Sequence, residues 1–318
     1  MRNPAGLFIC KGGSMYQYPK EFLPVDQLLQ KLTSSGIIIS SLAEARIALT
    51  NIGYYRLKGY SLQWFDPVSQ KYIANITFSD VLKLYYFDSE MSHLLFNYLS
   101  QIEISLKARL VNALQITHDA LILHDPSIFK DKQLYWKNQS TIASEISRSN
   151  DVFIEHNFNT YEGAIPLWAC VEVMSFGTIS KTIKNMKTGG DSAFSVLIQN
   201  YKFQNNKGLM VTPSKDMFTS WIQTASIIRN ICAHNSRIYN RTISTRPQLI
   251  LSDAMIPPPR YYGLYQIILS MKYLRPTDSS WLLFVDDFKR LLTKYSGVYD
   301  MNRMNFPHDW EKHFNISP

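Results

Sequence analysis

The sequence predicts an all-α fold, and three observations lead to that prediction. Apolar residues recur at intervals of three, four and seven, the spacing that places side chains on one face of a helix. Serine, proline and glycine stand at the ends of these stretches, where helices begin and end. Strand-like alternation of apolar and polar residues is scarce, and the chain has no internal repeat or low-complexity segment.

Two short helices are expected after an irregular lead-in at residues 1–20. The stretch PVDQLLQKLTSSG predicts a helix ended by Gly36, and SLAEARIALTNIG predicts a second helix ended by Gly53. The next stretch, IGYYRLKGYSLQWFDP, mixes rings with cations, a combination that can stack on bases and hold phosphates. The alternative is a turn whose rings pack into the core. The RNA-binding interpretation rests on Tyr54, Tyr55, Arg56, Lys58 and Tyr60.

A long helix, with at most one break, is predicted from FSDVLKLYYF to ALQITH. Its apolar residues recur at helical spacing and predict one buried face. That face consists of Leu84, Met91, Leu95, Tyr98, Ile102, Leu106, Leu110 and Ala113. Glu103 and Lys107 are four residues apart, so they can pair on the surface of this helix.

The rest of the chain predicts further helices. DKQLYWKNQSTIASEISRSN is a weaker one, and IPLWACVEVMSFGTISKTIKNM is one that starts near Pro166 and kinks or breaks at Gly177. Glu172, alone among apolar neighbours, is expected to be a paired structural carboxylate. Residues 186–213 are expected to be rich in loops. SKDMFTSWIQTASIIRNICAH is a strong helix with Ser214 as its N-cap. A loop at LSDAMIPPPR precedes the last helices, YYGLYQIILSMKYL and SWLLFVDDFKRLLTKY.

Composition indicates a soluble protein with an anionic partner. The chain has 318 residues, a formal net charge of +8 and a pI of about 9.2, which favours nucleic acid or a membrane surface as partner. Three scattered cysteines suggest neither disulfides nor zinc, so a cytoplasmic location is expected. No apolar run approaches the ~20 residues of a membrane helix. Histidines are dispersed and nucleotide-binding fingerprints are missing, so neither a metal nor a cofactor is expected.

The stretch IIRNICAHNSRIYNR carries the chemistry of interest. On an ideal helical wheel, the apolar face of this helix consists of Phe218, Trp221, Ile222, Ala225, Ile228 and Cys232. A separate polar stripe consists of Asn230, His234, Arg237 and Arg241, provided that the helix extends that far. Arg229 lies within the apolar face. Its charge must therefore be paired, reach outward along its aliphatic stem, or face a partner.

These residue types suit cleavage of RNA without a metal. His234 could move protons, because histidine is the side chain that ordinarily titrates nearest neutrality. Arg229 could stabilise charge on phosphorus, and Asn230 could orient the histidine or bind a phosphate oxygen. The ribose 2′-OH would attack the adjacent phosphate. For both side chains to act at one phosphate, the helix must bend or end between them, or two copies must meet in a homodimer.

The spacing alone is a weak signal. Arg303 and His308 have the same separation, although Pro307 argues against a continuing helix there. A chain of this composition should contain about one such match by chance.

Five blocks in order resemble Abi-like abortive-infection proteins of the AbiD/AbiF type. They are QLLQKLTSSGIIISSLAEARIALTNIGYYRLKGY, QIEISLKARL, PLWACVEVMSFGTISK, IRNICAHNSRIYNR and MNFPHDW, and they span roughly residues 20–312. The resemblance implies a single all-helical domain at residues 21–318. It also implies a HEPN-like bundle core near residues 78–295, with additional N- and C-terminal helices.

The same resemblance implies a function. HEPN-type proteins include RNases and toxins that cut RNA without metal, usually as dimers, through an Arg-x(4–6)-His motif. In this chain the motif falls on Arg229, Asn230 and His234. The family implies phage defence, with control by a neighbouring antitoxin that can be a structured RNA.

Three functions remain open at this stage. The first is a homodimeric endoribonuclease in which Arg237, Arg241 and the residues around Tyr54 grip RNA. The second is a non-catalytic RNA-binding protein in complex with a structured regulatory RNA. The third is a structural protein that senses a phage component, with Arg229 buried at a dimer interface.

Overall fold

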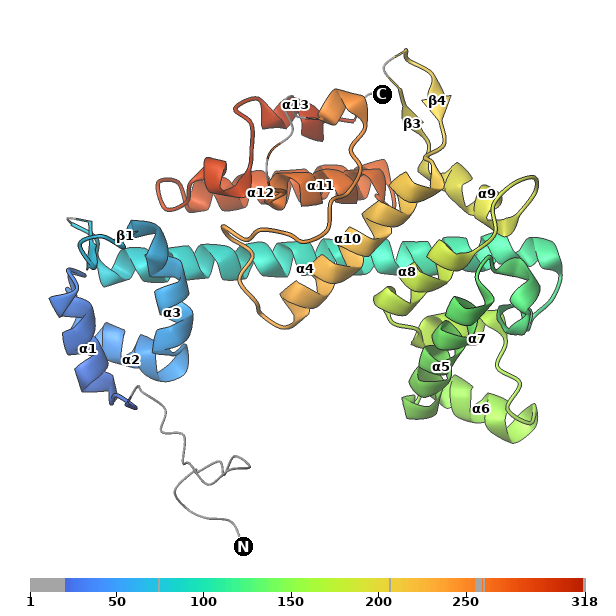
Figure 1. Cartoon of the computed structure of the whole chain (residues 1–318), viewed down its shortest axis with the longest axis horizontal. Helices are drawn as coiled ribbons and strands as arrows, with labels where there is room; N and C mark the ends of the chain where they lie inside the picture. The colour runs from blue at the N-terminus through green and yellow to red at the C-terminus, as the bar shows by residue number, and fades with distance from the viewer. Residues whose placement is uncertain (1–20, 74, 206, 255–258, 260, 317–318) are drawn as a thin grey trace, which may run out of the picture. The chain divides into compact units, whose positions relative to one another are not determined.

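The described residues are mainly helical, which confirms the all-α prediction (Figure 1). The computed structural model describes residues 21–73, 75–205, 207–254, 259 and 261–316, so the lead-in expected at residues 1–20 lies outside the described part. Contacts within the chain divide it into Met1–Tyr86 and Phe87–Pro318. The boundary falls inside the longest helix, and each unit is described by itself. The predicted single domain with a HEPN-like core stays a prediction.

The described residues of the first unit form three short helices, a small hairpin and the start of the long helix. Its elements are α1 (Val25–Ser34), α2 (Leu42–Asn51), α3 (Tyr54–Ser61), the 3-10 turn η1 (Leu62–Trp64), β1 (Phe65–Asp66), β2 (Lys71–Tyr72) and the beginning of α4 (Phe78–Leu114). The strands β1 and β2 pair antiparallel. Gly36 and Gly53 follow α1 and α2 with φ of 103° and 93°, so both predicted helix ends are confirmed.

The expected turn after Gly53 is wrong, because that stretch forms α3. Gly53 adopts a backbone conformation that other residues rarely reach, and this lets the chain begin a new helix at once. The aromatic residues had suggested a turn, but the apolar contacts of Leu57 and Tyr60, both buried, favour a helix.

The second unit holds most of the helices. After α4 its elements are η2 (Gln115–Thr117), η3 (Ile122–His124), η4 (Pro126–Ile128), α5 (Lys132–Arg148), α6 (Val152–Thr160), α7 (Leu167–Val173), α8 (Phe176–Asn185), α9 (Ala193–Ile198), η5 (Gln199–Tyr201), β3 (Phe203–Gln204), β4 (Met210–Val211), α10 (Lys215–Ala233), η6 (Leu251–Asp253), α11 (Leu264–Tyr273), α12 (Asp278–Lys294), η7 (Met301–Met304) and α13 (Trp310–Phe314). Helix α10 packs on α8 and α11, α5 packs on α7 and α8, and α11 packs on α13 (Figure 1).

Helix α4 follows the sequence pattern closely. It runs unbroken from Phe78 to Leu114, so the break that the sequence allowed does not occur. All eight residues of the predicted apolar face are buried. Glu103 and Lys107 do lie 3.9 Å apart, but each side chain is only 12 % exposed. The two side chains do pair as predicted, but they are largely buried and do not lie on the surface. Other parts of the chain therefore cover α4 beyond its apolar face.

The predicted break at Gly177 is also misplaced. Helix α7 ends at Val173 and α8 starts at Phe176, with Gly177 inside α8. Ser175 begins α8, because its hydroxyl accepts a hydrogen bond from the Thr178 backbone N–H at 3.3 Å. The carboxylate of Glu145 accepts hydrogen bonds from the Ser175 N–H and the Thr178 hydroxyl. The serine cap, fixed by a side chain of α5, decides the break rather than the glycine.

Two smaller expectations also need correction. Glu172 is exposed and makes no ion pair with a described residue, so it is not the paired structural carboxylate expected from its apolar neighbours. Residues 186–213 contain α9 and the β3–β4 hairpin besides loops. Among the described residues, none of the helices combines the length and hydropathy needed to cross a membrane.

Helix α10 positions the candidate site, and its start and face are as predicted. The Ser214 hydroxyl accepts a hydrogen bond from the Met217 N–H at 3.2 Å, which confirms the N-cap. The whole predicted apolar face of α10 is buried. This face fixes the rotation of the helix, and therefore the direction in which Arg229 leaves it.

Candidate functional site

Helix α10 ends one residue before His234. The chain turns there through Asn235, whose φ is 50°. The Ser236 N–H donates to the Ile231 carbonyl at 3.0 Å, and the Asn235 N–H donates to the Cys232 carbonyl at 2.9 Å. These two bonds form a Schellman motif, with asparagine in the left-handed position. The stripe through Arg237 and Arg241 was expected only if the helix extended that far, and that condition is not met because α10 ends at Ala233.

The segment after α10 is held by a buried carboxylate. Asp88 of α4 is 2 % exposed, and its Oδ1 accepts hydrogen bonds from the N–H groups of Ile238 at 3.1 Å and Tyr239 at 2.5 Å. Tyr239 is also buried, and its hydroxyl accepts a hydrogen bond from the Asp300 N–H at 3.1 Å. These contacts fix the path of the chain just beyond His234.

Arg229 is paired with Glu103 across two helices. Its Nε donates to Glu103 Oε2 at 3.0 Å, and its Nη2 donates to Oε1 at 3.0 Å and to Oε2 at 2.8 Å. Its Nη1 donates to Asn230 Oδ1 at 3.0 Å. The Arg229 and Glu103 side chains are 24 % and 12 % exposed. The place of Arg229 on the apolar face predicted that its charge needs a partner. Glu103 of the same chain is that partner, through a two-point ion pair.

Lys107 adds a second cation beside this pair. Its Nζ lies 3.9 Å from Glu103 Oε1 and donates to the Glu172 carbonyl oxygen at 2.8 Å. Two cations and one carboxylate therefore meet where α4 passes α10, and one positive charge is left over. Sequence reasoning missed the part of Glu103 here. The signal that could have found it is a lone carboxylate next to the buried face of α4, facing an arginine that needs a partner.

His234 presents an accessible imidazole at the end of α10. The residue is exposed, and its side chain makes no hydrogen bond with a described residue. Its backbone N–H donates to the Asn230 carbonyl at 3.0 Å, which closes the last turn. No hydrogen bond joins His234 to Arg229 among the described residues. Helix α10 continues from Arg229 to Ala233 and its last turn is closed at His234, so no earlier helix end lies between the two side chains. The other condition set by the sequence, two copies that meet in a homodimer, stays a prediction.

The remaining predicted RNA-binding residues differ in exposure. Arg241 is exposed and its Nη1 donates to the Arg237 carbonyl at 3.2 Å, whereas Arg237 is half-buried. In α3 of the first unit, exposed residues are Tyr55, Arg56 and Lys58. Tyr54 is half-buried.

Tyr60 does not fit the RNA-binding interpretation. It is 4 % exposed and packs edge-on against Tyr85, with ring centroids 5.6 Å apart. Its ring is therefore not available to stack on a base, and the core alternative holds for this residue.

The described thiols are expected to be unreactive in the folded protein. Burial raises the pKa of Cys170 to about 12 and that of Cys232 to about 11. Since the thiolate is the nucleophile, iodoacetamide at pH 8 should modify neither thiol in the native state. Mass spectrometry of peptides checks this, with protein unfolded in guanidinium chloride as the control that labels both. Rapid native labelling of Cys232, close to His234, would reopen a thiol-based mechanism.

The described residues contain no group of three or more histidine, cysteine, aspartate or glutamate side chains arranged to hold a metal ion.

One comparison with known proteins gives a match. A family model described as "Abi-like protein" matches residues 47–240, which is 194 of the 318 residues. The matched range includes Glu103, Arg229 and His234. No curated protein and no solved structure matches significantly.

Proposed function

The chain belongs to the Abi-like protein family, and from that premise we propose that it is an endoribonuclease. Family membership indicates a role in abortive infection, a bacterial defence against phage. The nuclease proposal depends on one observation, the end of α10. There Glu103 fixes the guanidinium of Arg229 at two points, and the imidazole of His234 is exposed at the cap of the same helix.

Arg229 is suited to stabilise charge that develops on a phosphate. Its guanidinium is a planar cation with five N–H donors. Glu103 occupies Nε and Nη2, and Asn230 accepts from Nη1, which retains a second proton. A donor held in place by its neighbours needs little rearrangement when the transition state forms. The surplus positive charge contributed by Lys107 favours an anionic substrate at the same place.

His234 would act on protons during the cleavage. The 2′-oxygen of the ribose forms a bond to phosphorus as the bond from phosphorus to the 5′-oxygen breaks. The proton of the 2′-OH passes to a base, and a second proton passes to the leaving 5′-oxygen. The products are a 2′,3′-cyclic phosphate and a 5′-OH, with no net change in composition. We assign one of these two transfers to His234.

A homodimer would complete the site. Each chain carries one His234, whereas the reaction needs an acid and a base. Two copies that meet near the α10 ends would supply two imidazoles and two Arg229 guanidiniums to one RNA backbone. Arg241, exposed on the segment after α10, would bind a neighbouring phosphate.

The test is cleavage of RNA by the purified protein in EDTA. We expect fragments with 2′,3′-cyclic phosphate and 5′-OH ends, because the nucleophile belongs to the RNA and the catalytic groups belong to the protein. A single 2′-deoxynucleotide at the cleaved position should block that cut and leave cuts elsewhere unchanged. Activity that needs added Mg²⁺, or that cuts at the deoxy position, would contradict this chemistry.

The Glu103 pair also favours a second candidate function. An arginine held at two points by a carboxylate can be structural, and the protein would then bind a structured regulatory RNA without cutting it. In that case RNA binding would be tight and sensitive to salt, would weaken in Arg241→Ala, and would be unchanged in His234→Ala.

A further inference from the structure

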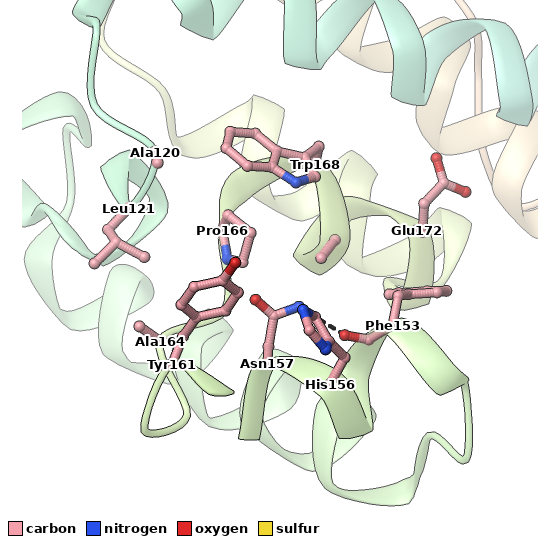
Figure 2. A pocket seen from close by; sticks show the side chains of 11 residues that line it. Ala120, Leu121, Phe153, His156, Asn157, Tyr161, Ala164, Pro166, Trp168 and Glu172 are labelled. Atoms are coloured by element: carbon pink, nitrogen blue, oxygen red, sulfur yellow. Dashed lines mark hydrogen bonds between the residues drawn. The ribbon is translucent and has the colours of Figure 1, made fainter. Parts of the chain in front are cut away.

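A pocket in the second unit is lined by neither Arg229 nor Glu103. It has a volume of about 610 Å³ and is formed by α6, α7, the residues that join them, and residues 120–121 (Figure 2). Four rings line it: Phe153, His156, Tyr161 and Trp168. A volume of this size is typical of a small-molecule site.

The rings of the pocket are unusually exposed for a folded protein. Trp168 is 57 % exposed, Tyr161 is 56 % exposed and Phe153 is 39 % exposed. Leaving such large apolar surfaces in water is unfavourable, and a group of them around a hollow marks a binding surface. In Figure 2 the Trp168 ring lies on one side of the hollow, with the Tyr161 and His156 rings across from it. These rings offer π faces to a ligand between them.

Two polar groups of the pocket can accept hydrogen bonds from a ligand. Asn157 is only 7 % exposed, and its Nδ2 donates to the Phe153 carbonyl at 2.6 Å. Figure 2 shows its amide pointing into the pocket, where Oδ1 makes no hydrogen bond with a described residue. Glu172 lies at the rim and supplies a carboxylate. An amide oxygen at the pocket with no partner among the described residues can accept a hydrogen bond from a ligand.

The charge of the surrounding chain is opposite to that of the whole protein. Residues 110–129 and 149–180, which include all the lining residues, contain no lysine or arginine, although the net charge is +8. They contain the acids Asp119, Asp125, Asp151, Glu155, Glu162 and Glu172. Lys107 of α4 donates to the Glu172 carbonyl oxygen at 2.8 Å, but it does not line the pocket. A phosphate would be repelled here, and a cation attracted.

We propose that this pocket binds a small organic cation that carries N–H donors, of the guanidinium, amidinium or ammonium class. A cation over the face of Trp168 or Tyr161 is attracted by the ring, and this attraction strengthens when water is excluded. Its N–H groups would donate to Asn157 Oδ1 and to the Glu172 carboxylate. The site does not depend on the nuclease proposal, because Arg229, Asn230 and His234 do not line it.

The test compares a cation with its uncharged counterpart. Benzamidinium and benzamide share size and shape, and isothermal titration calorimetry measures binding of each to the full chain. We expect saturable binding of benzamidinium and at least about tenfold weaker binding of benzamide, since only the first has the charge. Agmatine, which is aliphatic, tests the same site without an aromatic ring in the ligand. Equal binding of the neutral compound, or no binding of either cation, would overturn the proposal.

Variants locate the binding. Trp168→Ala and Glu172→Gln should each weaken benzamidinium about tenfold, whereas Glu155→Gln, an exposed carboxylate of α6 that does not line the pocket, should change it less than about twofold. Circular dichroism confirms that each variant is folded; Glu172→Gln is the variant to rely on if Trp168→Ala unfolds. Equal effects of Glu155→Gln and Glu172→Gln would place the binding elsewhere. Binding of a short arginine peptide without binding of the small cations would refute a small-molecule site.

Discussion

Replacing His234 by alanine is expected to lower the rate of RNA cleavage by about 10²- to 10⁴-fold, the usual contribution of a general acid or base. The imidazole is exposed and makes no hydrogen bond with a described residue, so its removal should leave the fold intact. The measurement is single-turnover cleavage of a labelled RNA in EDTA, with protein in excess. Circular dichroism of the variant shows whether the fold is kept.

The matched control is His93→Ala. His93 is also an exposed histidine, on α4, and no role in the chemistry is assigned to it. Its rate should stay within about twofold of the parent, because surface substitutions away from a site have small effects. Equal cleavage by the parent and His234→Ala would remove His234 from the mechanism. Equal loss in both variants would indicate a general effect of histidine removal.

His234 is a cleaner choice than Arg229 for this test. Substituting Arg229 would leave the Glu103 carboxylate, 12 % exposed, without its two-point partner. Removing one member of a largely buried ion pair destabilises a protein by itself. Lost cleavage in Arg229→Ala would therefore mix a missing catalytic group with a damaged fold.

Asp88→Ala is expected to lower the free energy of unfolding by about 3–5 kcal/mol, because two backbone N–H groups would lose a charged acceptor. The carboxylate is 2 % exposed and accepts from the Ile238 and Tyr239 N–H groups, which fix the segment beyond His234. Urea unfolding followed by circular dichroism measures the change. Since domains are stable by only about 5–15 kcal/mol, the loss should be obvious.

Asp287→Ala is the control for this stability prediction. Asp287 pairs with Arg290 at 2.8 Å on the surface of α12, with side chains 52 % and 73 % exposed. Exposed ion pairs contribute about 0–1 kcal/mol, so the variant should unfold almost like the parent. If Asp88→Ala were equally mild, the segment beyond His234 would be held by packing and not by the carboxylate. Asp88→Asn should be intermediate, because its amide oxygen can still accept from both N–H groups but carries no negative charge.

Some of the site could be foreseen from local sequence. The apolar spacing of α4 and α10 predicted their buried faces, and those faces fix which side chains point inward. The same pattern showed that Arg229 must have a partner, although it could not identify Glu103. That pair joins residues 126 positions apart, and only the packing of α4 beside α10 brings them together.

Other features depended on competition between signals. Gly177 was a plausible break, but Ser175 caps α8 through the Thr178 N–H. Glu145 accepts hydrogen bonds from both residues, although it lies 30 residues before Ser175 and 33 residues before Thr178. Asn235 could have been read as a helix end, since asparagine tolerates the left-handed conformation, yet His234 and Arg237 continued an apparent stripe. A helical wheel assumes that the helix continues. It cannot show where other hydrogen bonds of the backbone end the helix.

The sequence by itself determined the all-α class, the start of α10 at Ser214, the faces of the two long helices and the need to neutralise Arg229. These follow from periodicity and from the cost of burying a charge, both of which act locally along the chain. The tertiary structure decided the partner of Arg229, the anchoring of the segment after His234 by Asp88, and the existence of the aromatic pocket. Each of these needs groups from distant parts of the chain to meet, and their meeting is set by how the helices pack.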